Sequence, residues 1–235
     1  MSKTKYTNVF VLCTGRSGST TVAKACAKIE NYSSGHETKA SDIGSDRLSY
    51  PASHIEADNR LSWMLGSLDR QFGNAPFYVH LIREREEVVR SFGNRWNYSS
   101  SIIRFLAEGV FSLIPDLLGD KQKVTLCEDY YDIVNSNIEL FLKDKDNKMV
   151  MRLDSLEQDF QTFWKEIGAE GELEKALEEI RTPHNAGQSK EITAQKERAY
   201  ELELQQKILR KKLGEANQLR EKISIRLQLL ASKML

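Results

Sequence analysis

The sequence predicts an α/β fold, a three-layer sandwich in which a central parallel sheet lies between two layers of helices. Two short apolar runs, Val9 to Leu12 and Phe77 to Ile82, have the length and composition of buried strands. A third run, Lys148 to Leu153, predicts a last core strand. Segments with helical spacing separate these runs, which is the pattern of parallel strands joined by crossover helices. At 235 residues the chain is long enough for one such domain and an appendage.

The first predicted strand runs into a loop that suits an anion. Helix formers follow this loop, and the first turn of a helix offers free N–H groups and the positive end of the helix dipole. Gly15 and Gly18 permit positive φ angles and a close approach to a ligand, while Arg16 and the hydroxyl groups add donors. An ordinary hydroxyl cap would explain neither the glycines nor the arginine. The residues expected to bind a phosphate or sulfate are Thr14, Gly15, Arg16, Ser17, Gly18, Ser19, Thr20 and Thr21.

This loop differs from that of the nucleoside triphosphatases, which is GxxxxGK followed by Ser or Thr. Here Ser19 follows Gly18, and no glycine lies five residues before Gly18, so ATP or GTP chemistry is disfavoured. The run TGRSGSTT after a first strand resembles instead the 5′-phosphosulfate loop of sulfotransferases that use 3′-phosphoadenosine 5′-phosphosulfate (PAPS), in the Arg-containing form of the carbohydrate and bacterial branches. The resemblance implies a P-loop-like fold, PAPS as co-substrate, adenosine 3′,5′-bisphosphate as product, and no metal.

A second motif follows the strand at residues 77–82. Arg83 ends this strand, and Ser91 lies eight residues further on in a predicted helix over residues 84–92. An arginine at a strand end and a hydroxyl on a helix face could together bind a second phosphate. The spacing resembles the 3′-phosphate motif of PAPS sulfotransferases, and this implies that Arg83 and Ser91 bind that phosphate. Arg90 and Arg95 are weaker candidates for the same cleft.

Candidates for the general base come from a predicted short strand at residues 31–38, which ends on His36 and Glu37. In a doubly wound sheet, the carboxyl ends of the strands face one crevice, so these two side chains would face the phosphate loop. A solvated loop with one histidine and one glutamate is the alternative. The resemblance implies that Glu37, or failing that His36, takes the proton of the acceptor, while Arg16 neutralises charge as the sulfate leaves.

The other segments complete the domain. A polar loop over residues 39–52 could lie over the substrate. Helical spacing predicts helices over residues 58–72, 99–118 and 123–142, and Asp154 is the expected cap of a helix after the last strand. The proline, glycine and asparagine within residues 181–188 predict a loop. Its His184 and Asn185 resemble the closing segment that covers PAPS in related bacterial enzymes, although there is no GxxGxxK segment.

The C-terminal segment predicts a long helix. Apolar residues recur every seventh position at Leu202, Leu209, Ala216, Ile223 and Leu230, which is typical of a coiled coil. Such a stripe either pairs with a second chain or folds back on its own domain, and we expect a homodimer. The predicted organisation is therefore a sulfotransferase-like α/β domain at residues 6–188 and a helical extension at residues 189–235.

The amino-acid composition argues against several classes of partner and location. Lys plus Arg equals Asp plus Glu at 34 each, which argues against nucleic-acid and anionic-membrane partners. The N-terminus lacks the apolar core of a signal peptide, and no run reaches about 18 apolar residues, so a soluble cytoplasmic protein is expected. Its three cysteines lack metal-site spacing and are expected to be reduced structural thiols. The sequence thus predicts a PAPS-dependent sulfotransferase acting on a hydroxyl or amine of a small-molecule or glycan acceptor. The alternatives are a P-loop kinase-like nucleotide-binding enzyme and a non-catalytic coiled-coil interaction protein.

Overall fold

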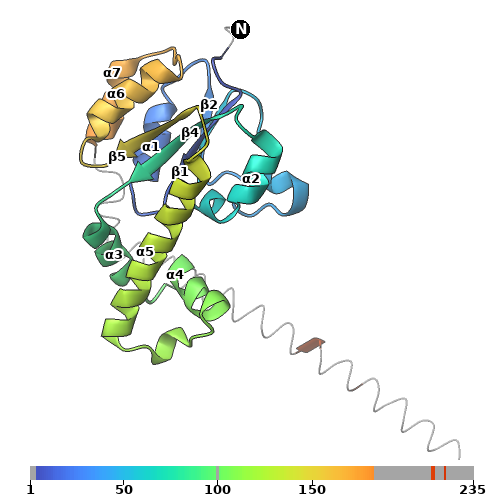
Figure 1. The fold of residues 1–235 in the computed structure, drawn as a ribbon, viewed down its shortest axis with the longest axis vertical. Helices are drawn as coiled ribbons and strands as arrows, with labels where there is room; N and C mark the ends of the chain where they lie inside the picture. Colours follow the sequence, from blue (N-terminus) through green and yellow to red (C-terminus); the bar gives the residue numbers. More distant parts are fainter. Residues whose placement is uncertain (1–3, 99–100, 183–212, 215–219, 221–235) are drawn as a thin grey trace, which may run out of the picture. The chain divides into compact units, whose positions relative to one another are not determined.

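The computed structural model describes residues 4–98, 101–182, 213–214 and 220. All but the last three of these residues belong to one unit, Met1–Ala186, and the description concerns this unit alone. It is an α/β fold with a five-stranded parallel sheet, and helices cover the sheet (Figure 1). The predicted fold class is confirmed. The predicted C-terminal helix and the domain boundary at residue 188 fall outside the described residues, except for Leu213, Gly214 and Arg220.

The sheet has the strand order β2-β3-β1-β4-β5. The central strand β1 is completely buried, and its Val11 pairs with Ala57 of β3 on one side and with Val79 of β4 on the other. Burial on both faces explains why β1 is an unbroken apolar run after Asn8. The strands are β1 Asn8–Leu12, β2 Ser33–His36, β3 His54–Ala57, β4 Phe77–Ile82 and β5 Lys148–Arg152.

Two hydrophobic cores lie on the two faces of the sheet. Val9 and Val11 of β1 belong to one core, and Phe10 and Leu12 belong to the other, as the alternation of side chains along a strand requires. The first core includes residues of α1 Ser19–Cys26, α6 Leu156–Glu166 and α7 Leu173–Arg181, and the second includes residues of α2 Leu65–Phe72, α3 Arg85–Gly93 and α5 Asp120–Leu142. The predicted three layers are therefore present.

The sequence analysis does not predict strand β3. Its sequence, His-Ile-Glu-Ala, contains two polar residues, but all four residues are buried, and His54 and Glu56 are hydrogen-bonded inside the protein.

The helix predicted over residues 58–72 is divided into two elements. A 3₁₀ turn at Asn59–Trp63 comes first, capped by the Asp58 side chain, which accepts the Arg60 N–H at 2.7 Å, and α2 follows at Leu65–Phe72.

Two further predictions need correction. The helix predicted over residues 99–118 is broken into α4 Ile102–Phe105, a π turn at Leu106–Val110 and a 3₁₀ turn at Pro115–Leu117, since Pro115 cannot continue a helix and Ser112 has a φ of 56°. Asp154 does not cap α6. Ser155 holds the cap position without a side-chain cap, and Asp159 accepts the Ser155 hydroxyl at 2.9 Å.

Other predicted elements are confirmed with small shifts: α5 begins at Asp120 rather than 123, and α3 covers Arg85–Gly93. The cysteines Cys13, Cys26 and Cys127 are free and buried. Within the described part of the chain, no helix is both long and apolar enough to cross a membrane, and no group of three or more potential ligand side chains could hold a metal ion.

Candidate functional site

The loop between β1 and α1 has a backbone that only certain residues accept. Gly15 has a φ of 78° and Gly18 a φ of 92°, and Arg16 between them has a φ of 59°. A Cβ atom at Gly15 would lie 3.0 Å from the Asn59 amide nitrogen, and one at Gly18 would lie 2.7 Å from Cδ1 of Leu153. Both glycines are therefore required for conformation and for space. Helix α1 begins at Ser19 directly after the loop, so its first N–H groups point out of the helix N-terminus.

The inner side of the loop is held by buried hydrogen bonds. The hydroxyls of Thr14 and Ser17 lie 2.9 Å apart, and both are within hydrogen-bonding distance of the Gly15 carbonyl oxygen, at 2.8 and 3.2 Å. The Tyr130 hydroxyl of α5 donates to the Thr14 carbonyl at 2.5 Å. Thr14, Gly15 and Ser17, which the sequence proposed as ligand contacts, are thus buried and shape the loop from within.

A cleft of about 740 Å³ opens on the outer side of the loop. Its walls come from the start of α1, from α3, from the residues after β5 and from the end of α7. The predicted ligand residues that line it are Arg16, Gly18, Ser19, Thr20, Thr21, Arg83 and Ser91. The two motifs meet because β1 and β4 are adjacent parallel strands, whose carboxyl ends lie at the same edge of the sheet.

Direct hydrogen bonds join the two motifs. Nε of Arg16 donates to the Ser91 hydroxyl at 3.1 Å, and Nη1 of Arg83 donates to the Arg16 carbonyl oxygen at 3.0 Å. Arg83 also forms an ion pair with Glu87, which lies four residues further along in α3, with Nε 2.7 Å from Oε2. Arg83 and Ser91 of the second motif are therefore both hydrogen-bonded to Arg16 of the first motif.

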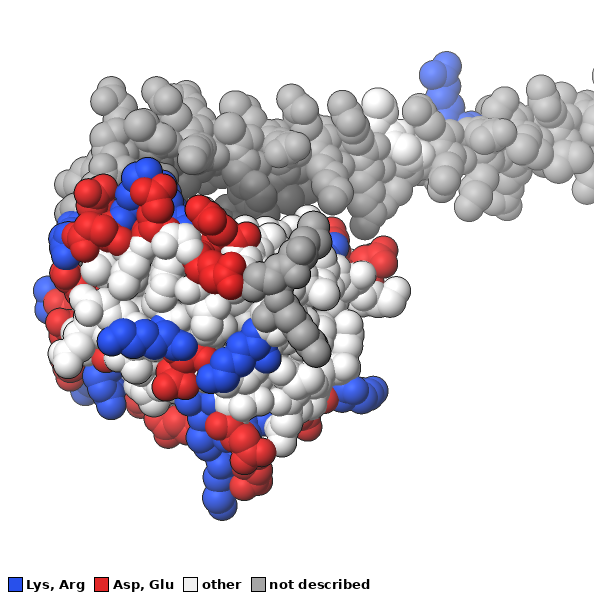
Figure 2. Space-filling model, turned by 90° about the horizontal axis from the view of Figure 1, so that it is seen from above, with Lys and Arg blue, Asp and Glu red and all other residues white. Residues whose placement is uncertain are grey.

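Positive charge gathers in this part of the cleft. Burial, together with the positive charges of Arg95 and Arg83, lowers the pKa of Arg16 to about 10. Arg90 and Arg95 line the same cleft, on and just after α3. On the face shown in Figure 2, by contrast, Lys and Arg side chains are interspersed with Asp and Glu side chains. The excess of positive charge is local, and it favours a ligand with several negative charges.

The opposite end of the cleft is more neutral. Arg181 at the end of α7 lines the cleft, but it is ion-paired with Glu157 at 2.5 Å and with Glu174 at 2.8 Å. Leu153, Leu156 and Ile180 add apolar surface nearby. The cleft therefore has a cationic end at α3 and a partly apolar end between α6 and α7.

His36 and Glu37 lie beside the cleft but do not line it. Nε2 of His36 is 3.0 Å from the Ser19 hydroxyl and 3.4 Å from the Thr20 hydroxyl, and these two residues do line the cleft. The Glu37 carboxylate forms an ion pair with Arg60. His36 thus adjoins the cleft through the start of α1. His184 and Asn185, the remaining candidates, fall outside the described residues.

Sequence reasoning did not select Arg60 and Arg181. The sequence predicts a plain amphipathic helix around Arg60 and only a loop that begins at Arg181. Arg60 pairs with Glu37 and Arg181 pairs with Glu157, each more than 20 residues away in the chain, so no local spacing could have indicated these two pairs. The second partner of Arg181, Glu174, lies seven residues before it.

No protein-family model matches the sequence, and no curated protein matches it. Among solved structures, the crystal structure of mouse sulfotransferase SULT7A1 complexed with PAP is similar, with a TM-score of 0.46 and 11% sequence identity. The match covers 74% of this chain and 64% of that chain. The chain thus corresponds to less than two thirds of that protein, and a functional assignment depends on the side chains of the cleft.

Proposed function

We propose that this chain is a sulfotransferase that moves a sulfuryl group from PAPS to a hydroxyl or amine of a small-molecule or glycan acceptor. The observation that carries the proposal is the contact between Arg16 and Ser91. It places a helix N-terminus suited to one anion beside a second cationic group suited to another, within a single cleft. PAPS presents two such anionic groups on one nucleotide, a phosphosulfate at the 5′ position and a phosphate at the 3′ position.

The donors in the cleft match this distribution of charge. The N–H groups and hydroxyls at Ser19, Thr20 and Thr21 would hold the phosphosulfate, as helix N-termini hold phosphate groups. Arg83 and Ser91 would hold the 3′-phosphate. The apolar surface toward α6 and α7 would contact the adenine ring of PAPS.

The chain's residues would promote an in-line transfer. A base next to the cleft accepts the proton of the acceptor as its oxygen or nitrogen bonds to sulfur. The bond from sulfur to the bridging oxygen breaks, and its electron pair stays on the 5′-phosphate, so the products are the sulfated acceptor and adenosine 3′,5′-bisphosphate. Arg16 would stabilise the charge that develops on the leaving phosphate. Of the two candidate bases, His36 is the better placed, because it contacts the hydroxyls that line the cleft, whereas Glu37 is ion-paired with Arg60.

The test is calorimetric titration with adenosine 3′,5′-bisphosphate, and separately with ATP and magnesium. We expect micromolar binding of the bisphosphate and a loss of about tenfold or more in Arg83→Ala. Arg85→Ala is the matched control, since Arg85 lies two residues further along the chain but pairs with Glu128 and Asp132 away from the cleft. Binding of ATP in place of the bisphosphate would refute the proposal in favour of a kinase-like enzyme. Absence of both would favour an interaction protein built on the C-terminal segment.

A further inference from the structure

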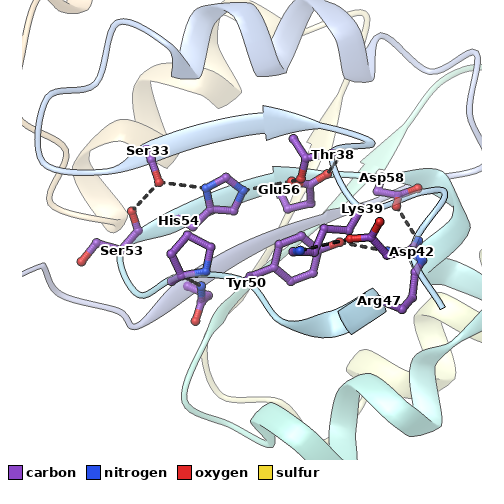
Figure 3. A network of polar contacts seen from close by, with 12 residues as sticks. Ser33, Thr38, Lys39, Asp42, Arg47, Tyr50, Ser53, His54, Glu56 and Asp58 are labelled. Carbon is purple, nitrogen blue, oxygen red and sulfur yellow. Dashed lines mark hydrogen bonds and ion pairs between the residues drawn. The ribbon is translucent and has the colours of Figure 1, made fainter. Parts of the chain in front are cut away.

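A cluster of polar side chains, built around two buried residues of β3, binds the segment that carries the two candidate general bases. We call it the Glu56 cluster, and it consists of Ser33, Thr38, His54 and Glu56 (Figure 3). The Glu56 side chain has no exposed surface. Its Oε1 accepts the Thr38 N–H at 2.8 Å, and its Oε2 accepts the Thr38 hydroxyl at 2.6 Å and lies 2.9 Å from Nε2 of His54.

The cluster holds both ends of β2. Nδ1 of His54 is 2.8 Å from the hydroxyl of Ser33, the first residue of β2, and Thr38 lies two residues after the strand ends. Burial by itself raises the pKa of Glu56, but the hydrogen bonds from His54 and Thr38 outweigh it and bring that pKa below its ordinary value. Glu56 is therefore a carboxylate at neutral pH, and a buried carboxylate is retained only where its hydrogen bonds are satisfied.

Glu37 has a conformation that needs such support. Its φ is 54°, which residues other than glycine rarely adopt and which persists only where the surroundings fix it. The Glu37 N–H donates to the Ala57 carbonyl at 3.1 Å, and the next residue, Thr38, makes its two hydrogen bonds to Glu56.

The fit around the cluster is tight. A Cβ atom at Gly35 would lie 2.2 Å from Cγ2 of Thr38 and 2.9 Å from Oε2 of Glu56. Only glycine at this position lets Thr38 reach the carboxylate. His36 and Glu37 thus lie between Gly35, which admits the close approach, and Thr38, which is bound on both its N–H and its hydroxyl.

We propose that Thr38 and Glu56 are positioning residues for sulfuryl transfer, which hold His36 and Glu37 beside the phosphate loop. The inference rests on the proposed function and extends it to residues that never touch the substrate. A displacement of about 1 Å in a reacting group is enough to lower a rate by about a hundredfold. A role in positioning therefore predicts a loss of turnover without a loss of nucleotide binding.

The test replaces one hydroxyl. Thr38→Val keeps the shape and the backbone hydrogen bond and removes the hydroxyl, and Thr38→Ser restores the hydroxyl. Thr38 is exposed and belongs to neither hydrophobic core, so neither change removes apolar packing. Thr162→Val is the matched control, because this hydroxyl donates to Gln158 on α6, away from the cleft. Binding of adenosine 3′,5′-bisphosphate is measured by calorimetry, and release of the bisphosphate from PAPS is measured with water and with a panel of simple alcohols, phenols and amines.

We expect Thr38→Val to bind the bisphosphate within about twofold of the unchanged chain and to lose about tenfold or more in kcat, with the KM for PAPS unaltered. Thr38→Ser should recover most of the rate, and Thr162→Val should show no change. Equal turnover in Thr38→Val, or a parallel loss of bisphosphate affinity, overturns the positioning role and leaves the proposed function intact. If the unchanged chain binds no bisphosphate, or binds it but transfers sulfate to no acceptor including water, the inference fails as well; the binding measurement separates these two cases.

Discussion

Arg16 combines a strained backbone with an unfavourable charge, so its replacement by asparagine should stabilise the protein while destroying its ligand site. The pKa of this side chain falls to about 10, mainly through burial and secondarily through Arg95 and Arg83. That shift corresponds to about 3 kcal/mol at neutral pH, and because the side chain is partly exposed, solvent screening reduces it to roughly 1 to 2 kcal/mol. Asparagine also tolerates the φ of 59° better than arginine does.

The loss of the hydrogen bond to Ser91 offsets about 1 kcal/mol of this gain. The net expectation for Arg16→Asn is a stabilisation of about 1 kcal/mol, which raises the Tm by roughly 2 to 4 °C in a domain of this size. Arg16→Lys keeps the charge and serves as the control, with no such rise. Thermal unfolding followed by circular dichroism gives the Tm, and calorimetry with adenosine 3′,5′-bisphosphate should show that binding is lost in Arg16→Asn. A lower Tm in Arg16→Asn, or retained bisphosphate binding, would refute the reasoning.

Three further changes test other parts of the molecule. Asp58→Asn breaks the buried ion pair between Asp58 and Arg47, whose Nη2 and Oδ2 lie 2.6 Å apart, and it should lower the free energy of unfolding in urea by about 3 to 5 kcal/mol; a change below about 1 kcal/mol would contradict this. The folded pKa of Glu56 lies below its ordinary 4.5, so its contribution to stability is present above that pH and is lost as the pH falls through the folded value. On acidification from pH 6 to roughly pH 3, the urea midpoint should therefore fall more in the unchanged chain than in Glu56→Gln, and equal falls would count against it. Leu209→Glu places a charge in the predicted heptad stripe and should convert a homodimer to a monomer in light scattering, whereas Lys211→Glu outside the stripe should not; a monomeric unchanged chain would contradict the coiled-coil hypothesis.

The strands that the sequence reveals are those buried on both faces. β1 and β4 are almost entirely apolar, apart from Asn8 and His80, because neighbouring strands and two layers of helices surround them. β3 is equally buried, but the polar residues His54 and Glu56 make it look unlike a buried strand. Their hydrogen-bond partners Ser33 and Thr38 lie about 20 residues away in the chain, so the local sequence does not show that they are satisfied. Local patterns cannot show that a polar residue is satisfied inside the protein.

The same limit applies to the candidate site. The loop after β1 and the arginine after β4 could be placed together from strand adjacency alone, because both follow carboxyl ends of parallel strands. The direction of each side chain could not be predicted. Thr14 and Ser17 point inward to the loop's own hydrogen bonds, and Glu37 pairs with Arg60, because these choices depend on atoms brought together by the folded chain.

The steric fit at Gly35 also has a consequence for how this chain can change over generations. A side chain at position 35 would collide with Thr38 and with the Glu56 carboxylate, so the order in which these positions can change is constrained. Position 35 can accept a larger residue only after position 38 or 56 has changed, whereas glycine at 35 is compatible with changes at either of the others. Descendant chains with a larger residue at 35 should therefore differ at position 38 or 56 as well.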